Sequence, residues 1–151
     1  MKKLSKDNKG FTLVEMIVVL VILAILAAIL IPGLLGYIDD AKNKQVEVHG
    51  KAVYTAAQSV ASKYYGTNKN PQSDTYKAAY IKDVKDLSEI TSFSGSATIY
   101  FEGAKTATDK TAYKVAGVKY TEGGVTRYLK SGNSEWSDSG EGLPSNSLDI
   151  S

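Results

Sequence analysis

Residues 11–38 read FTLVEMIVVLVILAILAAILIPGLLGYI, and Glu15 is the one charged side chain among them. From Met16 to Ile38 the chain has 23 residues without a charge. As a continuous helix they would extend about 35 Å, which is enough to cross a bilayer. The chain has 151 residues, so one polar domain of ordinary size can follow this segment. We therefore expect a membrane segment joined to a single domain, which excludes a simple soluble enzyme.

The residues that flank the apolar segment set its orientation. Residues 1–10 carry four lysines and one aspartate, whereas the other flank opens with Asp39 and Asp40. The positive-inside rule then places the amino terminus in the cytoplasm and residues 39–151 outside. No small-x-small cleavage site follows the apolar run, so this segment is expected to remain in the mature protein. Residues 11–151 hold 14 Lys and Arg against 15 Asp and Glu, so no nucleic-acid partner is predicted.

Glu15 is the anomaly of the apolar segment. A carboxylate near the lipid core costs about 2–3 kcal/mol or more unless it is paired, neutralised or close to the interface. In one interpretation it stays solvated at the cytoplasmic interface, as a plain signal anchor would allow. In the other, cleavage before Phe11 creates an α-amino group four residues away, which can pair with this acid in the same or a neighbouring chain.

The segment Lys9-Gly10-Phe11-Thr12-Leu13-Val14-Glu15, followed by an apolar helix with Pro32, resembles the type IV prepilin signature of pilins and pseudopilins. The resemblance covers roughly the first 55 residues. It implies that residues 1–10 form a leader peptide, which a membrane prepilin peptidase removes by cutting between Gly10 and Phe11. The same enzyme would methylate the new Phe11 amine. Glu15 would then attract the Phe11 terminus of an adjacent subunit during assembly.

The resemblance also implies the function. The chain would be a structural subunit without catalysis, anchored in the cytoplasmic membrane and then polymerised into a helical surface filament for adhesion, motility or biofilm formation. No nucleotide-binding motif is present, so an assembly ATPase and an inner-membrane platform are expected as partners. The retained acid favours a major subunit. The lack of cysteine and the lysine-rich leader are reminiscent of Gram-positive pilins.

Two other functions stay open. The chain could be a pseudopilin of a type II secretion or DNA-uptake system, although it has no Asp-Pro-Trp-Gly-like segment, and its tryptophan lies in Glu135-Trp136-Ser137. It could also be a bitopic membrane protein with a ligand-binding head. In that case the precursor and the mature protein would have identical masses.

A weak point is expected within the helix. Pro32 removes a backbone hydrogen bond, and Gly33 and Gly36 lower helix propensity. The resemblance implies that the stretch from Ala24 to Pro32 loses helical bonds in the filament, and a static kink is the alternative. Beyond Tyr37 the apolar residues recur at helical spacing, which predicts an amphipathic second half over residues 39–65 and one long helix from Thr12 to Tyr65.

The remaining residues predict an α+β head. Residues 66–95 are expected to form a connection with a short helix at Lys82–Ile90. Three strand-like runs follow within residues 96–130, namely Ala97–Phe101, Ala112–Tyr120 and Val125–Leu129. A turn at residues 121–124 suits a hairpin. The pattern predicts a small antiparallel sheet of three or four strands packed on the second half of the long helix, which is the pilin fold.

The tail, residues 131–151, is rich in Ser and Gly and carries four acidic and no basic residues. Residues 103–130 have a net charge of +4. The tail is therefore expected to lie against the sheet of its own subunit or of the next one, or else to remain solvated and mobile. Trp136 is interpreted as an anchor that packs the tail on the head.

Other chemistry finds little support in the sequence. Cysteine is absent, which excludes disulfides and thiol chemistry. The single histidine, His49, is interpreted as a surface or helix-packing residue, because nothing near it suggests a catalytic triad. Ser137, Asp138, Ser139 and Glu141 offer oxygen atoms but lack the spacing of a calcium loop. No cofactor or metal is predicted.

Overall fold

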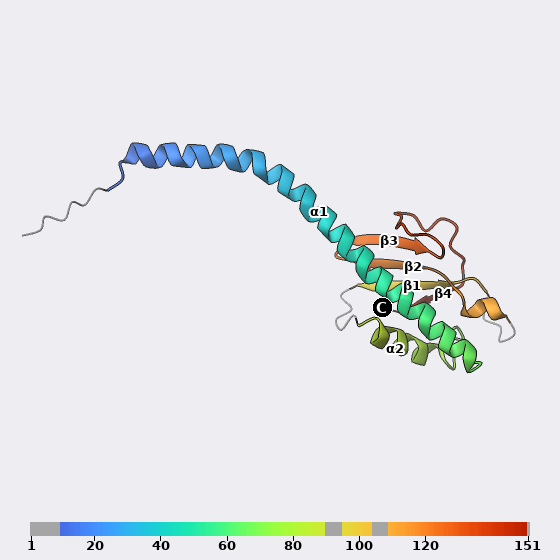
Figure 1. Ribbon diagram of the computed structural model, residues 1–151. Coiled ribbons are helices and arrows are strands. Elements are labelled where there is room, and N and C mark those ends of the chain that lie inside the picture. The colour runs from blue at the N-terminus through green and yellow to red at the C-terminus, as the bar shows by residue number, and fades with distance from the viewer. Residues whose placement is uncertain (1–9, 90–94, 104–108, 151) are drawn as a thin grey trace, which may run out of the picture. The chain divides into compact units, whose positions relative to one another are not determined.

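The computed structural model describes residues 10–89, 95–103 and 109–150 (Figure 1). The chain divides into two compact units, Met1–Asp40 and Ala41–Ser151. Helix α1, Leu13–Gly66, contributes residues to both units. Its bounds differ by one residue at each end from the expected 12–65.

In the first unit, α1 is continuous through Pro32. The stretch that was expected to lose helical bonds is helical in the isolated chain, so its melting on assembly stays a prediction. Every residue from Gly10 to Lys42 is exposed. The helix is long and apolar enough to cross a membrane by length and composition. A helix that is apolar on all sides needs lipid or other protein around it.

In the second unit, α1 buries one stripe of its surface. Its buried residues recur every three or four positions and are Val46, Gly50, Val53, Ala56, Ala57, Val60, Ala61 and Tyr64. This spacing places them on one side of the helix. Most of them are small, which allows the sheet and a second helix to pack closely against α1.

The sheet has four strands in the order β3-β2-β1-β4, and each neighbouring pair is antiparallel. The strands are β1 Ser96–Phe101, β2 Val115–Glu122, β3 Val125–Lys130 and β4 Ser147–Asp149. Figure 1 shows the sheet alongside the carboxyl-terminal part of α1, with helix α2, Lys77–Leu87, beside the same part. The expected α+β fold, a long helix on a small antiparallel sheet, is confirmed.

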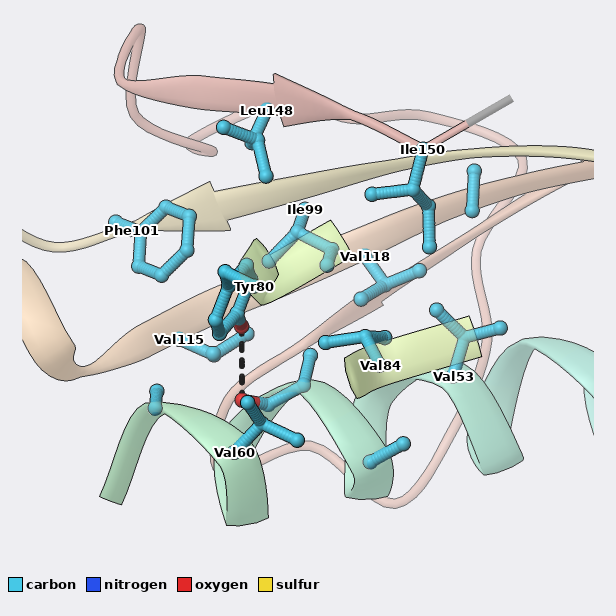
Figure 2. Close-up of a cluster of buried hydrophobic side chains, with 14 of the residues drawn as sticks. Val53, Val60, Tyr80, Val84, Ile99, Phe101, Val115, Val118, Leu148 and Ile150 are labelled. Atoms are coloured by element: carbon cyan, nitrogen blue, oxygen red, sulfur yellow. Dashed lines mark hydrogen bonds between the residues drawn. The ribbon is translucent and has the colours of Figure 1, made fainter. Parts of the chain in front are cut away.

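The core lies between these layers. Ile99 pairs with Val118 and with Leu148 on the two neighbouring strands, so these three side chains share one face of the sheet. Figure 2 shows them with Val84 of α2 and Val60 of α1. The phenol of Tyr80, which is fully buried, donates a hydrogen bond of 2.8 Å to the Ala57 carbonyl. Through this bond α2 is held to α1 by a polar contact within the apolar layer.

Helix α2 begins five residues earlier than predicted and ends before Ile90, which lies outside the described residues. The prediction missed residues 77–81 because one lysine and two alanines hide the periodicity there. Tyr80 and Val84 are both fully buried, one helical turn apart. Their burial against α1 stabilises the additional turn.

The strand predicted at Ala112–Tyr120 was wrong at its start. A 3-10 helix, η1, occupies Lys110–Tyr113, and the strand begins only at Val115. The Asp109 carboxylate accepts a hydrogen bond of 2.9 Å from the backbone N–H of Thr111, which caps this turn. The strand also continues through Glu122, leaving Gly123 and Gly124 as a two-residue turn with positive φ at both.

The tail lies against the head of its own chain. Ser137 forms an antiparallel bridge with Tyr128 at the β3 edge, and β4 pairs with β1 at the opposite edge. Between these points the side chain of Leu143 packs against the sheet at Gly117. A Cβ atom placed on Gly117 would lie 2.6 Å from that side chain. The tail therefore supplies a fourth strand.

Trp136 anchors the tail on α1. A Cβ atom placed on Gly50 would lie 2.3 Å from the Trp136 ring and 3.0 Å from the Tyr120 Cβ atom. Within a helix, alanine is normally more favourable than glycine. The close approach of Trp136 and Tyr120 explains why position 50 is glycine. The expected anchoring role of Trp136 is confirmed by this contact, although the sequence did not indicate that Gly50 receives the ring.

We predict that Gly50→Ala destabilises the head by about 1–3 kcal/mol, because the added methyl group displaces Trp136. Gly66→Ala is the matched control, since no atom lies within 4 Å of its added Cβ. Urea unfolding of the full chain in detergent, followed by the fluorescence of the single tryptophan, measures the effect. Equal stability of the Gly50→Ala variant and the parent would contradict the packing described here.

The raised pKa of Tyr120 predicts that the head becomes less stable at alkaline pH. Burial, with a smaller contribution from the charge and hydrogen bond of Glu122, raises the pKa of Tyr120 to about 12. In the unfolded chain a tyrosine titrates near pH 10. Between these two pH values the folded state holds more protons than the unfolded state. The contribution of Tyr120 to the free energy of unfolding is therefore fully present below about pH 10 and falls as the pH rises towards 12. We expect Tyr120→Phe to flatten this fall in calorimetric scans from pH 8 to 12, and an unchanged slope would refute the assignment.

Candidate processing and assembly site

The residues expected at the processing site lie just ahead of α1. Gly10 and Phe11 are outside the helix and exposed, and the Phe11 side chain is 80% accessible. Helix α1 begins two residues after Phe11. The peptide bond between Gly10 and Phe11 therefore lies in non-helical, exposed backbone, where a protease can bind it.

The start of α1 is fixed by reciprocal hydrogen bonds between Thr12 and Glu15. The backbone N–H and the hydroxyl of Thr12 each donate to Glu15 Oε2 at 2.7 Å. The backbone N–H of Glu15 lies 3.3 Å from the Thr12 hydroxyl oxygen, which accepts its hydrogen bond. This arrangement is a capping box, in which the two side chains satisfy helix N–H groups that have no partner within the helix.

Thr12 was not among the residues predicted to act at this site. The signal was available, because a threonine three residues before a glutamate at the start of an apolar run predicts a capping box. It also gives Glu15 a partner within its own chain. One of the two interpretations paired this carboxylate with an α-amine, and that pairing stays a prediction; within the described chain a hydroxyl and a backbone N–H bond it.

The negative charge of Glu15 remains available for a cation. Its partners in the capping box are neutral, and both Thr12 donors bind the same oxygen, Oε2. An ammonium group that approaches the carboxylate would add a charge-assisted hydrogen bond, which is stronger than a neutral one. The site can thus hold a cation while the helix start stays capped.

The four residues expected to weaken the helix, Ala24, Pro32, Gly33 and Gly36, all lie within α1. Nothing lies within 4 Å of a Cβ atom placed on Gly33 or Gly36. Contacts within the described chain therefore do not require glycine at these two positions. A role in close approach by another helix or in conformational change would account for them.

The other sequence candidates have structural roles. His49 contacts Glu122, and Asp138 forms an ion pair with Arg127. The Ser137 hydroxyl donates to the Ser139 carbonyl at 2.6 Å. Within residues 10–89, 95–103 and 109–150, no group of three or more His, Cys, Asp or Glu side chains could hold a metal ion.

The amino-terminal segment is similar in sequence to segments of known proteins. The prokaryotic N-terminal methylation motif matches residues 5–31, which include Gly10, Phe11 and Glu15. The chain is 38% identical over 60 residues to the type IV major pilin protein PilA of Myxococcus xanthus (strain DK1622). That match covers 40% of this chain and 27% of the relative. No solved structure matches the chain. The methylation motif and the identity to PilA show that the amino-terminal segment of this chain is similar to that of a type IV major pilin protein.

Proposed function

We propose that the chain is a structural subunit of a type IV pilus, made as a membrane-anchored precursor and polymerised into a helical surface filament. The main support for the proposal is the apolar surface of α1, which is exposed from Leu13 to Ile38. A capped helix start and a non-helical Gly10–Phe11 bond precede this surface in the chain. Lipid covers this surface in the precursor, and copies of the same helix cover it in the filament. Adhesion, motility or biofilm formation would follow from such a filament.

Processing is the first step of the proposed pathway. A prepilin peptidase would cut between Gly10 and Phe11, remove the leader, and methylate the Phe11 amine. The geometry supports this step because the capping box starts the helix at Leu13 and leaves the preceding bond outside regular hydrogen bonding. The new terminus would lie one residue from Thr12, beside the cap.

Assembly is the second step. Glu15 would bind the Phe11 amine of an adjacent subunit as the helices leave the lipid. Either charge alone would be costly in a packed apolar core, whereas a hydrogen-bonded pair offsets much of the desolvation penalty. The energy for extraction from the membrane would come from an assembly ATPase acting through an inner-membrane platform. Loss of helical bonds from Ala24 to Pro32 would adapt α1 to its new neighbours, helped by Gly33 and Gly36.

A pseudopilin of a type II secretion or DNA-uptake system is the second candidate, because it would share the methylation motif. Filament length separates the two functions. A pilus subunit forms long surface filaments at native expression, whereas a pseudopilin does not. A bitopic membrane protein with a ligand-binding head would instead retain residues 1–10.

The proposal predicts that the mature protein starts at a methylated Phe11 and that Glu15→Ala is cleaved normally but forms no filaments. Cleavage survives because the scissile bond lies four residues before the substitution, while the pairing of charges between subunits is lost. Intact mass measurement and amino-terminal sequencing report cleavage, and electron microscopy of sheared surface material reports assembly. Glu141→Ala removes an exposed acid in the tail and should leave both unchanged. A mature protein that begins at Met1, or abundant Glu15→Ala filaments, would refute the proposal.

The capping box predicts a difference between Thr12→Val and Thr12→Ser. Valine keeps the shape of threonine but removes the hydroxyl that bonds Glu15, whereas serine keeps it. Loss of a cap costs about 0.5–2 kcal/mol, so amides in the first turn of α1 should exchange roughly two- to thirtyfold faster in Thr12→Val. Hydrogen exchange of the full chain in micelles measures this. Similar rates in both variants would show that the hydroxyl does not stabilise the helix start.

A further inference from the structure

The head exposes few large apolar side chains, and they lie on or beside α1. In the described part of the head, from Ala41 onward, the exposed large hydrophobic residues are Val48, Tyr65 and Leu87. Single exposed apolar residues are normal on a protein surface, but Val48 and Leu87 line the same hollow. Their positions therefore indicate where the head meets a partner.

The first surface is a groove between α1 and α2, which we call the α2 groove. Two hollows of about 600 and 410 Å³ share Ser59 and Leu87, so they adjoin one another. Ala52 and Ala56 line the larger hollow together with Val48 and Leu87. The charged residues along the groove are three acids and two lysines, namely Asp83, Asp86, Glu89, Lys51 and Lys63. An aromatic side chain with a cation beside it suits such a groove.

The second surface, which we call the Tyr65 patch, lies on the other flank of α1. A helix has 3.6 residues per turn, so Tyr65 falls on the opposite side of the buried stripe from Ala56. Tyr65 is 50% exposed, and its ring meets the Tyr113 ring edge to face at 5.3 Å. The hollow beside it, of about 210 Å³, is lined by Lys110 and Lys114 and by no acid. This patch thus combines an exposed aromatic ring with positive charge.

One charge on each surface has no ion-pair partner among the described residues. These are Glu89 in the α2 groove and Lys110 in the Tyr65 patch. Their neighbours are already paired within the chain, as Lys114–Glu102, Asp86–Lys82 and Asp83–Lys63. Lys51 lies over the Tyr54 ring, 5.0 Å from its centre. Glu89 and Lys110 are therefore the charges that a second chain can pair, and such an exposed pair adds specificity more than affinity.

We propose that the Tyr65 patch of one chain docks in the α2 groove of the next, with Tyr65 beside Leu87 and Lys110 near Glu89. This contact rests on the proposed function, since packing of the α1 helices brings the heads of sister chains together. An aromatic ring with cations meets an apolar hollow with an excess of acids. Because the two surfaces differ, each chain offers both, and the contact repeats without closing. An open helical filament requires a contact of this kind.

The absence of cysteine makes the contact testable by crosslinking in whole filaments. In a variant that combines Glu89→Cys with Lys110→Cys, oxidation should join each chain to the next and give a ladder of dimers, trimers and longer species. Either substitution alone should give about tenfold less crosslinked product, because equivalent thiols would lie too far apart to be bridged. Glu135→Cys with Lys110→Cys moves one thiol to an exposed acid of the tail and should give no ladder. Dimers in comparable yield from either single variant would show a self-complementary contact and overturn the proposal.

An exchange of charges gives a second readout and decides alone if the double-cysteine variant does not assemble. Glu89→Lys places two cations at the contact and should lower the yield of sheared filaments about two- to fivefold. Glu89→Lys combined with Lys110→Glu should restore the yield. Filaments of the double-cysteine variant without a ladder, or a double charge variant that assembles no better than Glu89→Lys, would overturn the contact and leave the proposed function intact. A parent chain that forms no filaments would refute the proposed function and the contact with it.

Discussion

The apolar surface of α1 from Leu13 to Ile38 is the constraint on which the rest of this protein depends. These residues have no buried positions in the described structure, and at about 25 cal/mol per Å² of apolar area they cannot remain in water. Under the proposed function, a bilayer would cover this surface in the precursor and a bundle of like helices would cover it in the filament. The capped start at Thr12 and Glu15 suits both, because its hydrogen bonds stay within one chain.

The head uses the continuation of the same helix in a different way. From Val46 to Tyr64, α1 presents a stripe of mostly small side chains, and the sheet and α2 pack on it. The tail then adds the strand β4 and places Trp136 against Gly50. Packing and backbone hydrogen bonds thus close the head without a disulfide, since the chain contains no cysteine.

Much of this architecture could be predicted from the sequence, because strong patterns carry it. The helix ends were correct within one residue, since the apolar run and Gly66 mark them. The strands near Ile99 and Val125 follow from β-branched residues between turns. The start of α2, the turn η1 and the strand β4 could not be predicted, because contacts distant in sequence determine them. Helix α2 is stabilised by the hydrogen bond from Tyr80 to Ala57, and β4 by the pairing of Ser147 with Tyr100.

The site shows the same division. Gly10, Phe11 and Glu15 follow from a local motif, and Thr12 could have been found from its spacing to Glu15. The contact between His49 and Glu122 joins residues 73 positions apart, so no local pattern in the sequence indicates it.

The position of β4 has a consequence for the order of events during synthesis. Strand β1 has β2 on one side and β4 on the other, and β4 is the last described strand to be made. Until it arrives, one edge of β1 has unpaired N–H and C=O groups that can bind a strand of another chain. A newly made chain is therefore most vulnerable to edge-to-edge aggregation in the interval before residues 147–149 are synthesised.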